Sequence, residues 1–183
     1  GDKKVQLWNL CKNKEPNKPN PLPRSGHTMT MYKTSYWMFG GTVNGLLDPN
    51  IKKVGPCNEL WLLEMFKNGT YTWNKQTPKG DIPTPRSNHV AAYIKKNDGT
   101  DCLLIHGGMS PNGKLDDLYL LDFNQNKFIK VDFDVNSKIP SPRAHHSGHY
   151  YEGKFYIFGG NGGNMYENQV FKDLWVLDVE SMV

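Results

Sequence analysis

The stretch Tyr36-Trp37-Met38-Phe39-Gly40-Gly41 occurs in three versions along this chain of 183 residues. Each version is a short run of large, mostly apolar residues that ends in a pair of glycines. The other two copies are Leu103-Leu104-Ile105-His106-Gly107-Gly108 and Phe155-Tyr156-Ile157-Phe158-Gly159-Gly160. Such a recurrence indicates that the chain is built from repeats of one structural unit.

A second motif precedes each glycine pair, and it contains all three arginines of the chain. A histidine follows each arginine after three residues, and the first glycine of the pair follows after 16, 21 and 16 residues. The copies of this motif begin at Arg24, Arg86 and Arg143. A third motif follows each glycine pair, and its copies are Asn58–Glu64, Asp116–Asp122 and Lys172–Asp178.

The repeats are separated by 62 and then 57 residues, measured from arginine to arginine. Within each unit the apolar runs are short, rich in aromatic and β-branched residues, and separated by Gly, Asn and Pro. This pattern is typical of consecutive antiparallel strands, and no segment keeps the periodicity of a helix. We therefore predict an all-β fold.

The three motifs together resemble those of the kelch-repeat proteins, over nearly the whole chain. The resemblance implies that each repeat is one blade of four antiparallel strands in a kelch-type β-propeller. A glycine pair suits the end of a strand where a side chain would clash and where a positive φ is needed. The residues that carry the resemblance are the glycine pairs and the aromatic residues of the third and fourth strands: Gly40, Gly41, Gly107, Gly108, Gly159, Gly160, Trp61, Tyr119, Trp175, Trp73 and Phe128.

The strand count predicts three blades, over residues 24–78, 86–133 and 143–179, of which the last lacks a fourth strand. Residues 4–10, with Trp8 at the aromatic position, fit a fourth strand of a preceding or last blade. Three blades do not close a ring, since propellers have about four to eight. Two explanations stay open: the chain is a piece of a longer kelch protein, or two copies pair into a six-bladed ring in which the N-terminal strand of one completes the last blade of the other.

Composition limits the classes of function. The net charge is +4, but the lysines are scattered in runs of at most two, which does not favour a nucleic-acid partner. No run is long and apolar enough to predict a membrane span, and three unpaired cysteines indicate an intracellular location. We find no catalytic or metal-ligand motif, and we predict a protein that is not an enzyme and needs no cofactor.

A binding surface is therefore expected, on the face formed by the loops between second and third strands and by the connections from each fourth strand to the next blade. Long loops on rigid scaffolds carry most recognition. In the first of these loops, Leu46, Leu47 and Ile51 stand beside Lys52 and Lys53, and this combination suits a peptide with acidic and apolar residues. Leu46 and Leu47 fit equally well as side chains that fold back onto the blade. The arginines are expected either to make structural bonds or to line the centre of this face. The candidate contact residues are Leu46, Leu47, Ile51, Lys52, Lys53, Met165, Tyr166, Phe171, Arg24, Arg86 and Arg143.

Kelch domains mostly bind other proteins, so the resemblance implies a protein-interaction module. The alternative is the substrate-positioning region of a larger enzyme system, such as a kelch-linked serine/threonine phosphatase or a ubiquitin-ligase adaptor.

Overall fold

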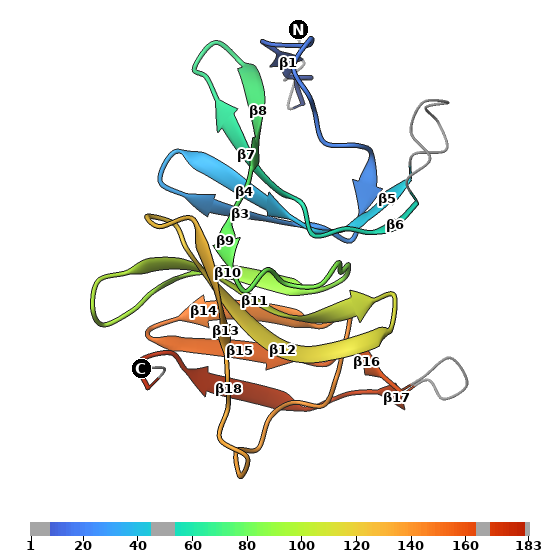
Figure 1. The fold of residues 1–183 in the computed structure, drawn as a ribbon, viewed down its shortest axis with the longest axis vertical. Coiled ribbons are helices and arrows are strands. Elements are labelled where there is room, and N and C mark those ends of the chain that lie inside the picture. Colours follow the sequence, from blue (N-terminus) through green and yellow to red (C-terminus); the bar gives the residue numbers. More distant parts are fainter. Residues whose placement is uncertain (1–7, 45–53, 164–168, 182–183) are drawn as a thin grey trace, which may run out of the picture.

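A computed structural model describes residues 8–44, 54–163 and 169–181. These residues form strands, turns and loops, and the all-β prediction is confirmed. No helix in the described part of the chain is long and apolar enough to cross a membrane. Figure 1 shows three blades stacked along the long axis of the molecule, with blade 1 and blade 3 at the two ends.

Each blade is a meander of antiparallel strands. Blade 1 consists of β3 (Thr28–Tyr32), β4 (Ser35–Phe39), β7 (Leu60–Met65) and β8 (Thr70–Gln76), with β1 (Lys12–Asn13) added in parallel outside β8. Blade 2 consists of β10 (Val90–Lys95), β11 (Asp101–Ser110), β12 (Gly113–Asp122) and β13 (Lys127–Val131), with β9 (Lys79–Gly80) added in parallel outside β13. Blade 3 has three described strands, β14 (Ser147–Tyr151), β15 (Lys154–Phe158) and β18 (Leu174–Asp178).

The chain beyond each glycine pair continues as a hairpin. In blade 1 this extension is β5 (Thr42–Asn44) paired with β6 (Val54–Pro56) and with β2 (Arg24–Ser25). In blade 3 it is β16 (Asn161–Gly162) paired with β17 (Gln169–Val170). In blade 2 the extension is part of β11 and β12 themselves, with a bulge between His106 and Gly108. The connection between the second and third strands of blade 2 is therefore a tight hairpin, with only residues 111 and 112 between β11 and β12, and not a long loop.

The hydrophobic core lies between the blades. Leu103, Ile105 and Leu121 on one face of blade 2 pack against Trp37, Phe39 and Leu60 of blade 1. On the other face of blade 2, Leu104, Leu118 and Leu120 pack against Phe155 and Ile157 of blade 3. Because successive residues of a strand point to opposite faces, a blade that is covered on both sides needs nearly continuous apolar runs. This explains the composition of the third-strand motif.

The N-terminal segment differs from the expected strand at its described end. Residues 8–10 are not in a strand, and the side chains of Trp8 and Leu10 are 91% and 97% exposed. The remainder of the predicted strand lies outside the described residues.

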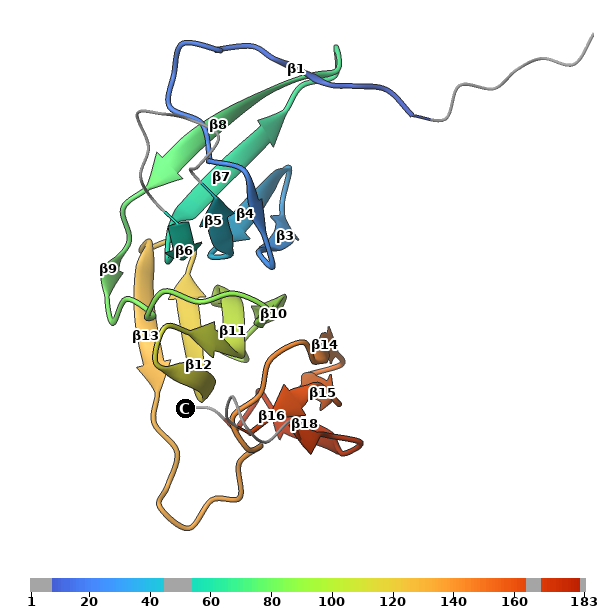
Figure 2. The ribbon, with the colours of Figure 1, turned by 90° about the vertical axis from the view of Figure 1, so that its right-hand side faces the viewer.

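The connections between blades also depart from the expected binding face. Lys79 of β9 pairs with Lys127, the first residue of β13, at the end of the blade opposite the glycine pair. Figure 2 shows this connection, and the one that carries β1, running along the outer edges of their blades. These two connections were predicted to belong to the binding face, but they lie along the outer edges of blades 1 and 2.

Candidate functional site

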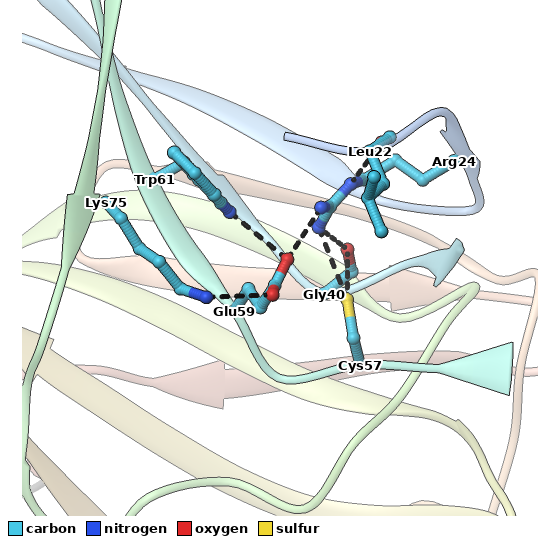
Figure 3. A network of polar contacts seen from close by, with 7 residues as sticks. All are labelled: Leu22, Arg24, Gly40, Cys57, Glu59, Trp61 and Lys75. Carbon is cyan, nitrogen blue, oxygen red and sulfur yellow. Dashed lines mark hydrogen bonds and ion pairs between the residues drawn. The ribbon is translucent and has the colours of Figure 1, made fainter. Parts of the chain in front are cut away.

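Arg24 is the centre of a polar network in blade 1 (Figure 3). Its guanidinium group donates to the carbonyl oxygens of Leu22 and Gly40, at 3.1 and 3.0 Å, and to Cys57 Sγ at 3.2 Å. It also forms an ion pair of 2.7 Å with the Glu59 carboxylate. The second oxygen of that carboxylate accepts from Lys75 Nζ at 2.9 Å, so one acidic residue holds two cations.

The other two arginines repeat this network. Arg86 binds the Gly107 carbonyl at 3.0 Å and both oxygens of Asp117 at 2.6 and 2.9 Å. Arg143 binds the Gly159 carbonyl at 3.0 Å and both oxygens of Asp173 at 2.7 and 2.8 Å. A planar guanidinium group matches a carboxylate in this bidentate geometry, which lysine cannot reproduce.

Arg86 and Arg143 have no exposed surface. The prediction that Arg86 and Arg143 contact a partner is therefore wrong for this structure, because a partner cannot reach a side chain that has no exposed surface. Arg24 is also nearly covered, with 3% of its side chain exposed. The structural alternative, in which each arginine ties the glycine pair to the third strand of its own blade, is the arrangement observed.

The acidic partners were missed in the sequence. Glu59, Asp117 and Asp173 each stand two residues before the aromatic residue of the third strand, and this regular spacing is the signal that was available. The hydrogen bonds from Arg143 hold the pKa of Asp173 well below its usual range. The acid therefore stays ionised, as the bidentate pair requires.

Backbone hydrogen bonds join each blade to the next at the glycine pair. The Gly41 N–H donates to the Arg86 carbonyl at 2.9 Å, and the Gly108 N–H donates to the Arg143 carbonyl at 2.8 Å. A Cβ atom on Gly108 would lie 2.8 Å from the Ser87 carbonyl oxygen and from His89 Cβ. Both glycines also have positive φ angles, of 92° and 103°. The second glycine of the pair is thus required by close contact with the start of its own blade, at Ser87 and His89, as well as by backbone conformation.

Buried histidines lie at the same two interfaces. His89 Nε2 is 2.8 Å from Thr28 Oγ1, and His146 Nε2 is 3.0 Å from His106 Nδ1. Burial lowers the pKa of His89 and His106 to about 3 and that of His146 to about 4, so all three are neutral near pH 7. A cluster of three or more His, Cys, Asp or Glu side chains that could hold a metal does not occur among the residues that the structure places.

Seven of the predicted contact residues lie in segments that the structure does not describe. Leu46, Leu47, Ile51, Lys52, Lys53, Met165 and Tyr166 lie outside the described residues. Phe171 is described, and its ring centre lies 4.2 Å from the Arg143 guanidinium carbon. Phe171 therefore covers the arginine network, which explains in part why Arg143 is inaccessible.

The described surface has a hollow between blades 2 and 3, beneath the connection that follows β13. A cavity of about 60 Å³ is walled by apolar side chains, among them Leu118, Phe155 and Trp175, and has Asp116 and Lys138 on its lining. A wider hollow of about 310 Å³ lies next to it and shares Asp116, Phe133 and Ile139. Figures 1 and 2 show the connection itself projecting beyond the blades.

This connection also exposes apolar residues beside acidic ones. Val135 is 96% exposed and Ile139 is 37% exposed. The carboxylates of Asp116, Asp132 and Asp134 line the wider hollow with one lysine, Lys130. This hollow is therefore lined by apolar residues and by more acidic than basic ones, and it differs from the predicted contact surface around Lys52 and Lys53.

Solved structures support the fold independently. A chain from a cryo-EM structure of RAG in complex with one melted and one unmelted RSS superposes with a TM-score of 0.68 at 14% sequence identity. The match covers 92% of this chain and 55% of that chain.

Sequence comparison finds closer relatives. Human host cell factor 2 is 33% identical over 157 residues, which are 84% of this chain and 19% of that protein. Human host cell factor 1 is 34% identical over 84% of this chain and 8% of that protein. The flagellar outer-arm dynein alpha chain of Chlamydomonas reinhardtii is 30% identical over 86% of this chain and 3% of that protein. The chain thus spans less than a fifth of the length of each of these relatives.

The KLHDC2/KLHL20/DRC7 Kelch-repeats domain family matches residues 45–183. That range includes the second and third copies of the arginine motif and two of the three glycine pairs, and Gly108 of the first of these pairs joins blade 2 to blade 3. The chain belongs to the kelch-repeat family.

Proposed function

We propose that this chain is a protein-interaction module that binds a partner at the hollow between blades 2 and 3 and along the connection over residues 134–142. Membership of the kelch-repeat family and similarity to the host cell factors support a role in protein interaction. The observation that carries the location is the apolar cavity, which lies beside exposed Val135 and Ile139. Small apolar pockets surrounded by polar groups are where anchoring side chains of a partner bind.

The charge of this surface defines the partner. Asp116, Asp132 and Asp134 favour a peptide segment with basic residues next to an apolar anchor. The acidic and apolar peptide expected from Lys52 and Lys53 stays a prediction, since those lysines lie outside the described residues. An intracellular location and a role in positioning the substrate of a larger enzyme also stay predictions.

A site-specific photo-crosslinker tests the location. A crosslinker at Val135 is expected to capture a discrete protein from the source cell. A crosslinker at Asn97 is expected not to capture that protein. Asn97 is also exposed, but it lies in the turn between β10 and β11, at the opposite end of blade 2. The proposal is wrong if both positions capture the same proteins with equal yield.

Removal of acidic groups near to and far from the hollow tests the chemistry. Asp132→Asn with Asp134→Asn should reduce the crosslink from Val135, because two charges that attract a basic segment are lost. Asp98→Asn removes an exposed carboxylate at the opposite end of the blade and should leave the crosslink unchanged. Equal yields from the two sets of variants would show that the acidic groups do not select the partner.

A further inference from the structure

The turn between β7 and β8 presents an Asn-Gly dipeptide to solvent. Asn68 and Gly69 are both exposed, and a Cβ atom on Gly69 would have no neighbour within 4 Å. The side-chain amide of an asparagine is open to attack by the main-chain nitrogen of the next residue, and a glycine there has no side chain to hinder the attack. The dipeptide therefore has the composition and the accessibility that a spontaneous covalent change requires.

Two donors hold the side-chain oxygen of Asn68. The Thr70 N–H donates to Asn68 Oδ1 at 3.1 Å, and the Thr70 hydroxyl donates to the same oxygen at 2.7 Å. Attack at Asn68 Cγ turns Oδ1 into an oxyanion, and donors that already point at an oxygen that gains negative charge lower the barrier. Thr70 is therefore placed to assist a reaction at Asn68.

The other Asn-Gly pairs that the structure describes in full are placed differently. Asn112, before Gly113, is exposed, but in the part of the chain that the structure describes its side-chain oxygen accepts no hydrogen bond. Asn161 Oδ1 is buried, and a Cβ atom on Gly162 would clash with the Phe171 ring. The first pair lacks the two donors and the second is enclosed, so the arrangement at Asn68 is specific to its turn.

A turn of the same kind between β10 and β11 shows how the fold would accept an aspartate. There Asp98 stands at the position of Asn68, and its carboxylate accepts from the Thr100 N–H at 2.8 Å. In both turns a main-chain N–H also donates to the threonine carbonyl, of Thr70 or of Thr100, at 2.9 Å. An aspartate at position 68 would therefore keep the turn and add one negative charge to it.

Isoaspartate would not fit this turn. In isoaspartate the main chain runs through the side-chain carboxyl carbon, so it is longer than in aspartate. The turn is closed by two hydrogen bonds, from the Phe66 N–H to the Thr70 carbonyl at 2.9 Å and from the Gly69 N–H to the Phe66 carbonyl at 3.0 Å. A longer chain between these groups removes their match and would loosen the hairpin of β7 and β8.

We propose that Asn68 is a site of spontaneous deamidation, assisted by Thr70. The Gly69 nitrogen bonds to Asn68 Cγ and loses its proton, the bond from Cγ to Nδ2 breaks, and the amide group leaves with that proton as ammonia. Water then adds to either carbonyl of the resulting succinimide and opens it to aspartate or isoaspartate. The bond from the Gly69 N–H to the Phe66 carbonyl opens before the attack, which is a local event in an exposed turn.

Peptide mapping by mass spectrometry, after incubation of the folded protein at mildly alkaline pH, tests the site. The expected product is a peptide containing position 68 with the mass gain of an amide replaced by a carboxyl group, in two forms that separate by chromatography. Asn68 should convert faster than Asn112, and Asn161 should stay intact. The proposal is overturned if Asn68 stays intact, or if Asn112 converts as fast as Asn68.

A pair of threonine variants tests the assistance. Thr70→Val keeps the N–H donor and the shape of the side chain but removes the hydroxyl donor, and should slow conversion of Asn68 by about two- to tenfold. Thr100→Val makes the same change in the matching turn and should leave the rate at Asn68 unchanged. Equal rates at Asn68 in the two variants would contradict the role of the Thr70 hydroxyl.

The same comparison in urea separates the folded turn from the local sequence. With the turn unfolded, the wild type and Thr70→Val should convert at equal rates, because the hydroxyl is no longer held against Asn68 Oδ1. A difference between them that persisted in urea would assign the effect to the neighbouring residue type and overturn the proposal. Circular dichroism at the start of each incubation shows whether Thr70→Val has kept its strands.

Discussion

Thr28 Oγ1 lies 2.8 Å from His89 Nε2 across the first blade interface, whereas at the second interface Val90 occupies the Thr28 position and has no hydroxyl group to offer His146. His106 takes over this role, with Nδ1 at 3.0 Å from His146 Nε2. The histidine that interrupts an otherwise apolar strand thus compensates for the loss of a hydroxyl group on the neighbouring strand.

This relationship predicts a rescue. His106→Phe introduces the residue found in the other two repeats, and it should lower the free energy of unfolding by about 1–3 kcal/mol because His146 loses its hydrogen-bond partner while still buried. Adding Val90→Thr should restore most of this loss by supplying the hydroxyl group that Thr28 supplies in blade 1. Urea unfolding of the wild type, both single variants and the double variant measures the effect. The compensation would be contradicted if the double variant lost as much free energy of unfolding as the two single variants lose together.

The buried histidines predict that the fold weakens in mild acid. In the folded protein the pKa values of His89 and His106 are about 3 and that of His146 is about 4, against an unfolded value near 6.5. Between these values the unfolded chain binds more protons, so stability is fully present above pH 6.5 and falls as the pH is lowered towards 4. Each histidine contributes up to ~1.4 kcal/mol per pH unit.

Urea unfolding at several pH values measures this slope. The double variant Val90→Thr with His106→Phe has one buried histidine fewer, so its slope should be smaller by about one proton. His149→Asn removes an exposed histidine and serves as the control. A free energy of unfolding that does not change between neutral pH and mild acid would contradict the burial of these side chains in solution.

The repeats made the fold predictable, because their strands and glycines are local patterns. The positive φ angles of Gly40 and Gly41, and the clash that a side chain would meet there, were predicted from the glycine pair alone. The role of the arginines could not be decided in the same way. Arg86 and Asp117 are 31 residues apart in the chain, and only the folded blade shows that they satisfy each other and are buried. The hollow beneath residues 134–142 could likewise not be predicted from the sequence, since it is formed by side chains from two blades.

The glycine pair provides a test in which strain and close contact are separated. Gly160 and Gly99 have almost the same φ, 85° and 84°. A Cβ atom on Gly160 would lie 2.7 Å from the Ala144 carbonyl oxygen, whereas one on Gly99 would have no neighbour within 4 Å. Gly99→Ala should therefore cost only the backbone strain, about 1–2 kcal/mol. Gly160→Ala should cost ~1–3 kcal/mol more, because the neighbouring backbone has to move.

Thermal or urea unfolding of the two glycine variants compares them directly. Equal losses would show that the backbone conformation alone requires glycine at position 160, and that the approach of Ala144 is relaxed at no cost.

The three arginine networks should not be equally sensitive to loss of the guanidinium group. Arg86→Met removes both hydrogen bonds to the Asp117 carboxylate and leaves a partly buried charge without a cation, for which a loss of about 3–5 kcal/mol is expected. Arg24→Met should cost less, because Glu59 keeps its ion pair with Lys75 and accepts from Trp61 Nε1 at 3.2 Å. The free energies of unfolding of the two variants, measured at the same pH, give the comparison. A larger loss for Arg24→Met would show that its contacts with the Gly40 carbonyl and Cys57 outweigh the ion pair. Lys75→Met, combined with Arg24→Met, is the decisive addition: the loss should then exceed that of Arg24→Met alone, because the Glu59 carboxylate loses its ion pairs with both Arg24 and Lys75.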